Sequence, residues 1–278
     1  MLVHISQHIL PISLLYEVIF FIRESLLKLE KVSERDSIKT DVPESLKHNF
    51  RTAFYILRYS RENPLPILDY CGMPVLTATR VWTDASGHIK ASPSIGIFVP
   101  GSSKESPLVA ALAFPRFFLH AVDDQGKRAH CKTTALECLG PLASLCLDPM
   151  RFFGKEVVFH IDNMASVTSM GKGHSKDPWA STLIRATRTV VASLCCGVFA
   201  SWERRRSSRG SCIADDLTHN LVASLDDHEV RAYISKSAVA FPLPILDWMA
   251  SPSKESSLGR KCVMWLRRQF LERIQVNL

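Results

Sequence analysis

The order of strand-like and helix-like segments between residues 80 and 220 constrains the fold more strongly than any other feature of the sequence. Three short apolar runs with turn signals between them come first, and two further runs then alternate with helical stretches. The predicted strands cover 80–86, 94–101, 108–114, 156–162 and 197–203, and the predicted helices cover 133–147, 179–195 and a stretch beginning at 214. Three consecutive strands followed by helical crossovers predict an α/β fold with a mixed five-stranded sheet, in the order β-β-β-α-β-α-β-α.

The segments that flank this sheet divide the chain into three regions. Residues 1–79 read as a helical extension, residues 80–222 hold the sheet, and residues 223–278 combine a proline-rich segment with a C-terminal amphipathic helix. The most apolar stretch, residues 9–22, is too short to span a bilayer and is interrupted by a proline and a glutamate. It also lacks the features of a signal peptide, so we expect an amphipathic or buried helix there and no membrane partner.

Composition and charge narrow the classes of function. With 46% hydrophobic and 22% charged residues, the sequence is that of a globular protein rather than a disordered or fibrous one. The formal net charge of +7 favours an anionic partner. The 8 cysteines form no CxxC pair and no zinc-finger spacing, which favours reduced thiols in an intracellular protein over a structural zinc site.

Four carboxylates stand in apolar surroundings, where an isolated anion is costly to bury. Asp84 and Asp162 lie near the ends of strands predicted to be neighbours. Glu137 lies within the helix expected to cross them, and Asp215 lies at the start of the last helix. Ordinary alternatives are a turn role for Asp84 and an N-cap or first-turn role for Asp215. If the four converge, a divalent cation must neutralise them, and such oxygen sites select Mg²⁺ or Mn²⁺ and suit two-metal phosphodiester hydrolysis.

The segments that carry these carboxylates resemble the four signature segments of ribonucleases H. They read TDASG at 83–87, TTALECLGPLASL at 133–145, HIDN at 160–163 and ADDLTHN at 214–220. The chain is most similar to the ribonuclease H-like domain of retrotransposon reverse transcriptases, particularly DIRS-like elements, without the polymerase domain. The resemblance covers about residues 80–222 and implies a ribonuclease H-like fold with helical N- and C-terminal extensions. The N-terminal extension resembles at most a thumb or connection segment.

The resemblance also implies a reaction and the roles of individual residues. The ligands of two Mg²⁺ or Mn²⁺ ions would be Asp84, Glu137, Asp162 and Asp215. Asp84 would bridge both ions, and the RNA strand of an RNA/DNA hybrid would be cleaved to leave a 5′-phosphate and a 3′-hydroxyl group. Ser86 and Asn163 would contact the RNA backbone or its 2′-hydroxyls. The glutamate stands second in the order, which separates the chain from transposases and integrases of this fold, because those end in glutamate.

Basic residues near the predicted carboxylates add a candidate nucleic-acid surface. The cations expected to contact phosphates are Lys172, Arg204, Arg205 and Arg206. The ordinary alternative for the arginines is a solvated basic loop. Trp82 and Trp202 are expected in the core rather than as platforms for base stacking.

Two departures from the family pattern keep a second hypothesis open. Many ribonucleases H carry a histidine shortly before the last aspartate, and the stretch between Trp202 and Asp215 has none. Asp216 also adjoins Asp215 as a competing ligand. One hypothesis is a nuclease that acts on RNA/DNA hybrids, with a polymerase module as a partner in trans. The other is a catalytically inactive nucleic-acid-binding or scaffold remnant of the same fold.

Overall fold

The computed structural model describes residues 47, 78–87, 93–103, 105–236, 240–252 and 257–276. The predicted helical extension over 1–79, including the apolar stretch within it, lies outside the described residues apart from Lys47 and its last two residues. Within the described ranges, no helix combines the length and the apolar character that crossing a membrane requires. The seven cysteines of these ranges are free thiols, and four of them are buried.

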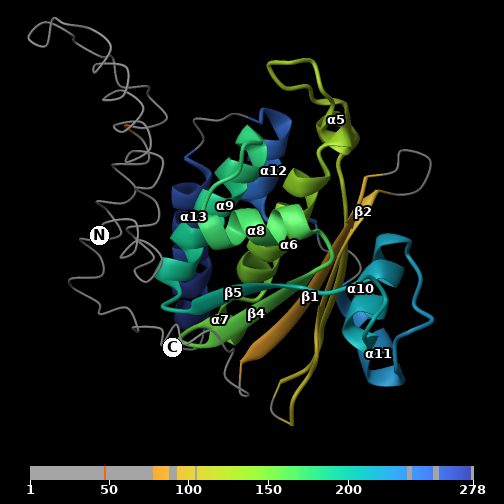
Figure 1. Cartoon of the computed structure of the whole chain (residues 1–278). Coiled ribbons are helices and arrows are strands. Elements are labelled where there is room, and N and C mark those ends of the chain that lie inside the picture. Colours follow the sequence, from red (N-terminus) through yellow and green to blue (C-terminus); the bar gives the residue numbers. More distant parts are fainter. Residues whose placement is uncertain are drawn as a thin grey trace, which may run out of the picture.

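A five-stranded mixed sheet forms the centre of the molecule (Figure 1). Its strands are β1 (Thr79–Ser86), β2 (Ser94–Val99), β3 (Leu108–Ala113), β4 (Glu156–Ile161) and β5 (Gly197–Trp202). They lie in the order β3-β2-β1-β4-β5, with antiparallel pairing from β3 to β1 and parallel pairing from β1 to β5. The predicted α/β class and the mixed five-stranded sheet are therefore confirmed, and each strand lies close to its predicted bounds.

Helices cover both faces of this sheet. Figure 1 shows α6 (Thr133–Leu147), α8 (Met164–Lys172) and α9 (Pro178–Ser193) on one face, and α10 (Arg209–Thr218) with α11 (Asp227–Lys236) on the other. All residues of β2 are buried, as expected for a strand covered on both sides. The helix predicted over 133–147 is confirmed at both ends.

Capping residues explain two differences from the predicted helices. The sequence predicts that the last helix of the sheet region begins at 214, but α10 begins at Arg209 because Ser208 and Ser211 form a capping box. α8 lies where the sequence predicts no helix; Asn163 caps its start, and Gly173 ends it with a φ of 83°. Both starts depend on local hydrogen bonds from side chains to the backbone, which apolar periodicity does not reveal.

The segment between β3 and α6 folds into α5 (Arg116–His120) and the short 3-10 helix η1 (Ala129–Cys131). Lys132 connects this segment to α9 through ion pairs. Its buried ammonium group lies 2.8 Å from a carboxylate oxygen of Asp123 and 2.8 Å from one of Asp177. Because Asp177 caps α9, the segment is tied to the helices on this face of the sheet.

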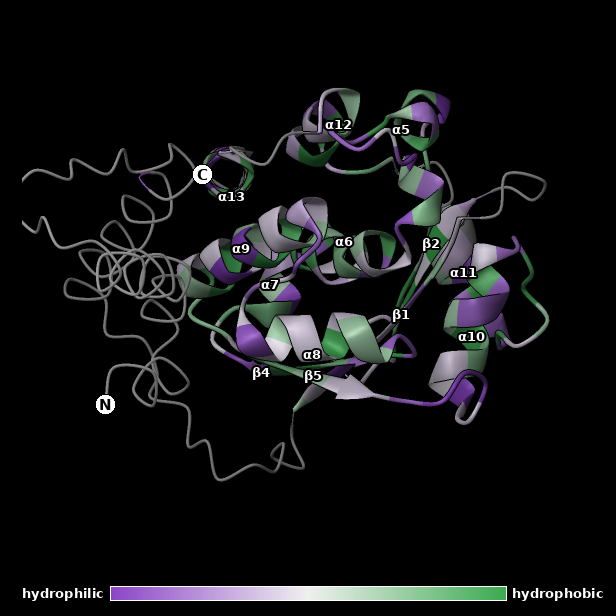
Figure 2. Cartoon of the chain, turned by 45° about the horizontal axis from the view of Figure 1, so that its top comes forward, coloured by the Kyte–Doolittle hydropathy of each residue, from purple (hydrophilic) through white to green (hydrophobic). Residues whose placement is uncertain are grey.

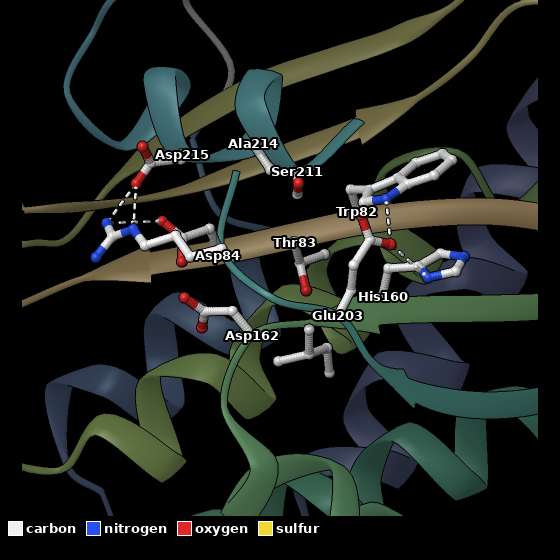
Figure 3. A pocket seen from close by; sticks show the side chains of 11 residues that line it. Trp82, Thr83, Asp84, His160, Asp162, Glu203, Ser211, Ala214 and Asp215 are labelled. Atoms are coloured by element: carbon white, nitrogen blue, oxygen red, sulfur yellow. Dashed lines mark hydrogen bonds and ion pairs between the residues drawn. The ribbon is translucent and has the colours of Figure 1, made fainter. Parts of the chain in front are cut away.

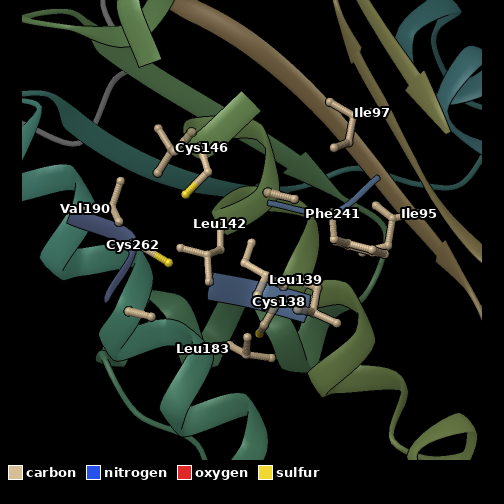
Figure 4. Packing of buried hydrophobic residues seen from close by; sticks show 14 of the residues in the cluster. Ile95, Ile97, Cys138, Leu139, Leu142, Cys146, Leu183, Val190, Phe241 and Cys262 are labelled. Atoms are coloured by element: carbon tan, nitrogen blue, oxygen red, sulfur yellow. The ribbon is translucent and has the colours of Figure 1, made fainter. Parts of the chain in front are cut away.

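Buried side chains of α12 (Leu243–Ala250) and α13 (Leu258–Val276), and Phe241 before them, belong to the same hydrophobic core as the sheet. α12 forms within the proline-rich segment, and α13 packs along α9 as the predicted C-terminal helix. Phe241 and Cys262 pack beside residues of α6 and β2 in one buried cluster (Figure 4). The short helix α7 (Pro149–Phe152) links α6 to β4.

Candidate metal centre

Three of the four predicted carboxylates meet at one edge of the sheet. Asp84 lies near the end of β1, and Asp162 directly follows β4, which is the parallel neighbour of β1. Glu137 reaches them from α6. One oxygen of each carboxylate lies within 4.8 Å of the others. Mg²⁺–oxygen bonds of about 2.1 Å place opposite ligands about 4.2 Å apart and adjacent ligands about 3.0 Å apart, so the three carboxylates must move closer together by up to about 1.8 Å to bind one ion.

Two glycines allow the helices to approach the central strands this closely. Gly140 of α6 faces Thr83 of β1, where an added Cβ would lie 2.7 Å from the Cβ of Thr83. Gly96 of β2 faces α10, where an added Cβ would overlap the backbone carbonyl oxygen of Ala214. Without side chains at these two positions, α6 and α10 can bring their carboxylates to the edge of the sheet where β1 ends.

Asp84 and Glu137 each keep one buried oxygen that has no hydrogen-bond partner among the described residues. The two residues are only 6% and 2% exposed. Burial, followed by the charge of Asp162, raises the pKa of Asp84 to about 6. Burial and the charge of Asp84 raise the pKa of Glu137 well above its usual range. Because buried polar atoms are normally paired, these oxygens mark a place suited to a proton or a cation.

Asp215 faces the same cleft but is joined to the triad through an arginine (Figure 3). Arg205 donates a hydrogen bond of 2.7 Å from Nε to Oδ1 of Asp215, and its terminal nitrogen lies 3.6 Å from Oδ2 of Asp84. Arg206 donates to the other oxygen of Asp215 at 2.6 Å. Burial favours a neutral Asp215, but the hydrogen bonds from Arg206 and Arg205 together lower its pKa.

Asp215, rather than Asp216, lines the cleft together with Asp84 and Asp162. Asp216 instead pairs with Arg206 at 2.6 Å and accepts a hydrogen bond from the hydroxyl of Ser224. Consecutive residues of a helix point about 100° apart, so the two neighbours cannot both face the triad. The ordinary alternative for Asp215, an N-cap or first-turn residue, is wrong because α10 begins six residues before it, at Arg209.

Asp162 is the most accessible member of the triad. Burial raises its pKa, and Arg205 opposes this effect. The backbone carbonyl of Asp162 accepts a hydrogen bond of 2.9 Å from the indole N–H of Trp202. Trp202 is 47% exposed, so the expectation that it lies in the core is wrong; it stands at the end of β5, the edge strand of the sheet. Trp82 is partly buried against a hydrophobic cluster, as predicted.

The other predicted site residues lie partly at the surface and partly inside. Lys172 and Arg204 are exposed. The side chain of Asn163 accepts a hydrogen bond of 2.9 Å from the backbone N–H of Ser166, which gives it a structural role at the start of α8. Ser86 is 6% exposed at the end of β1, and this burial does not favour contact with an RNA backbone.

Glu203 is the centre of a hydrogen-bond network that the sequence analysis does not predict. It accepts hydrogen bonds from the indole N–H of Trp82 at 3.0 Å and from the hydroxyl of Ser208, and its carboxylate lies 2.9 Å from Nδ1 of His160. Burial lowers the pKa of His160, and the charge of Glu203 opposes this effect. The network joins two central strands to the cap of α10, and Figure 3 shows it on the opposite side of the cleft from Asp215. In the sequence, only the position of Glu203 at the end of a predicted strand indicates this network.

The donor set of the triad suits a hard divalent cation. All three ligands are carboxylates, which Mg²⁺ and Mn²⁺ prefer over the nitrogen and sulfur ligands typical of zinc sites. Two of their oxygens are buried without a hydrogen-bond partner in the described part of the chain, as a site for a cation requires. Comparisons of the chain with protein-family models, curated proteins and solved structures gave no match. The chemistry of this site is therefore the basis for assigning a function.

Proposed function

We propose that this chain is a divalent-metal-dependent endonuclease of the ribonuclease H type, which cleaves the RNA strand of RNA/DNA hybrids. The observation that carries the proposal is the pair of buried oxygens on Asp84 and Glu137, which lie beside Asp162 and have no hydrogen-bond partner within the described residues. The strand order and the carboxylates near β1, β4 and α6 support a ribonuclease H-like fold. The choice of a hybrid as the substrate rests on the resemblance of the four signature segments to ribonucleases H.

The carboxylates would hold two ions in this proposal. Asp84, Glu137 and Asp162 would bind the first, and Asp84 with Asp215 would bind the second. Bound Mg²⁺ or Mn²⁺ would supply the Lewis acidity that activates a water molecule and stabilises negative charge at the scissile phosphate. The raised pKa values of Asp84 and Glu137 reflect repulsion and burial that a cation would offset.

Exposed groups around the cleft suit a polyanionic duplex. Figure 2 shows hydrophilic residues along the loop from β5 to α10, which contains Arg204. Arg204 and Lys172 are available for phosphate contacts. The exposed ring of Trp202 is held beside Asp162 by its indole N–H and offers a flat apolar face on which a base or sugar can stack.

Cleavage of a labelled RNA/DNA hybrid by the full chain tests the proposal. We expect cleavage of the RNA strand in the presence of Mg²⁺ or Mn²⁺, none in EDTA, and none of the DNA strand. Asp162→Asn should abolish cleavage, because it replaces a negatively charged metal ligand by a neutral amide at the most accessible position of the triad. Asp247→Asn is the matched control, since Asp247 is exposed on α12 and the same charge is removed.

The outcomes of this experiment distinguish between the two hypotheses that the sequence suggests. Cleavage that survives Asp162→Asn would contradict the proposed site. Hybrid binding without cleavage, weakening steeply as salt increases, would instead favour a nucleic-acid-binding module of the same fold. The network of arginines on Asp215 is the observation that favours this second function, since these cations neutralise a carboxylate that the reaction needs.

A further inference from the structure

The guanidinium group of Arg205 lies between two carboxylates of the candidate metal centre. It donates a hydrogen bond to Asp215 and lies 3.6 Å from Oδ2 of Asp84, which accepts no hydrogen bond from the described residues. The cavity that these residues line together with Asp162 has a volume of only about 10 Å³. This is about the space of a single water molecule, so little room remains in the cavity beside the guanidinium group.

We propose that Arg205 is an internal counter-cation, which occupies the position of the second ion between Asp84 and Asp215 and must leave before that ion binds. The inference rests on the metal site of the proposed function but not on its cleavage activity. The charge of Arg205, together with that of Arg206 on the other oxygen of Asp215, relieves the repulsion among the carboxylates in the metal-free protein. It also keeps the second ion from binding tightly until a substrate phosphate gives the guanidinium group another anionic partner.

The position of Arg205 in the fold allows such a movement. Its side chain is 54% exposed, and it lies in the loop between β5 and α10 rather than in the core. Glu203 and Ser208 hold the two ends of this loop through their hydrogen bond. The guanidinium group can therefore turn outward toward solvent or a phosphate without loss of packing in the sheet or in α10.

Titration calorimetry of the full chain with Mg²⁺ and with Mn²⁺, in the absence of nucleic acid, tests this inference. We expect the wild-type chain to bind one ion detectably and a second only weakly. Arg205→Gln removes the charge but keeps a polar side chain, and it should tighten the second ion by about tenfold or more, because a like charge beside the site is lost. Arg204→Gln removes the same charge from an exposed neighbour in the same loop and should leave both affinities unchanged.

Thermal unfolding gives a second readout that does not depend on activity. In EDTA, Arg205→Gln should unfold at a lower temperature than Arg204→Gln, because its carboxylates lose their counter-cation. Saturating Mg²⁺ should raise its unfolding temperature by more than that of the wild-type chain.

Three results would overturn the inference. One is equal binding of the second ion by Arg205→Gln and the wild-type chain, and another is an equal gain in Arg204→Gln, which would indicate only the general effect of net charge. The third is no ion binding by any of the three proteins, which would overturn the metal site as well. If Arg205→Gln binds the second ion more tightly but the wild-type chain does not cleave a hybrid, the proposed nuclease activity is overturned and the counter-cation role of Arg205 is supported.

Discussion

At the scale of single residues, the carboxylate of Asp84 lowers the stability of the metal-free protein. Its folded-state pKa of about 6 lies above the ordinary value of 3.8 for an aspartate, so the folded protein retains this proton to a higher pH. Stability therefore decreases as pH rises from about 4 through about 6. We predict that Asp84→Asn in EDTA at pH 7 increases the free energy of unfolding by about 2 kcal/mol, and that this difference vanishes near pH 4.

Denaturant unfolding at a series of pH values measures this effect. Asp247→Asn, on the exposed side of α12, should show no such increase. Saturating Mg²⁺ should reverse the ranking, because only the wild-type chain gains stability from the bound ion. A metal-free Asp84→Asn protein that is less stable than the wild type at pH 7 would contradict the prediction.

The charge of Glu203 is predicted to hold the loop that carries the arginines. Glu203→Gln keeps the shape of the side chain and one acceptor oxygen, but its amide nitrogen cannot accept a hydrogen bond. The variant therefore loses either the contacts of Oε2 with Trp82 and His160 or the contact of Oε1 with Ser208. We expect a loss of about 1–3 kcal/mol in the free energy of unfolding and faster amide exchange over residues 204–208. Glu156→Gln at the start of β4 should change neither quantity. If the two variants have the same free energy of unfolding and the same amide exchange rates, Glu203 does not position the loop.

At the scale of elements, the close packing of α10 on the sheet depends on Gly96. An alanine there would place its Cβ against the backbone carbonyl of Ala214, which cannot move aside as a flexible side chain can. We predict that Gly96→Ala reduces the free energy of unfolding by about 1–3 kcal/mol and weakens Mg²⁺ binding, because α10 carries Asp215.

Gly171→Ala is the control for this prediction. Gly171 lies within α8, and a Cβ there would meet no atom within 4 Å. Alanine is the better helix former, so this variant should be as stable as the wild type or more stable by up to about 1 kcal/mol. A Gly96→Ala protein as stable as Gly171→Ala would mean that α10 is packed less tightly than described.

The elements that sequence analysis could and could not predict differ in what determines them. The strands and α6 follow from apolar periodicity, and their bounds were predicted closely. The start of α10 follows from the capping box of Ser208 and Ser211, which lies in a stretch that reads as a basic loop. α8 is short, with as many polar as apolar side chains, so its start is visible only through the cap at Asn163.

At the scale of the whole molecule, the candidate site was predictable as a set of residues but not as an arrangement. Carboxylates in apolar segments stand out in a sequence because burial is so unfavourable for them, and this identified Asp84, Glu137 and Asp162. The contacts of Arg205 and Glu203 depend on how distant segments pack. Trp82 and Glu203, for example, are 121 residues apart in the chain. Only the folded structure reveals that the loop between β5 and α10 places Arg205 beside the carboxylates.

Whether the C-terminal helices are an appendage or part of one cooperative unit is also a property of the whole molecule. Leu266 of α13 is 2% exposed and belongs to the buried cluster that contains Cys146 and Cys262, which lie close to each other in Figure 4. Met264, two residues earlier on the same helix, is 51% exposed. We predict that Leu266→Ala lowers the free energy of unfolding of the entire sheet domain by about 2–4 kcal/mol, because it leaves a cavity in the shared core.

Met264→Ala removes a large apolar side chain from the same helix and should change the free energy by less than about 0.5 kcal/mol. Circular dichroism follows the whole fold, while Mg²⁺ binding reports on the carboxylate edge of the sheet. If α13 is part of the core, both signals are lost in one transition, and Leu266→Ala shifts them together. If the sheet domain unfolds at an unchanged temperature while only a minor helical signal moves, α13 is an independent appendage. The core shared by α6, α9 and α13 favours the first outcome, because the helix that carries Glu137 then depends on the C-terminal helix for part of its packing.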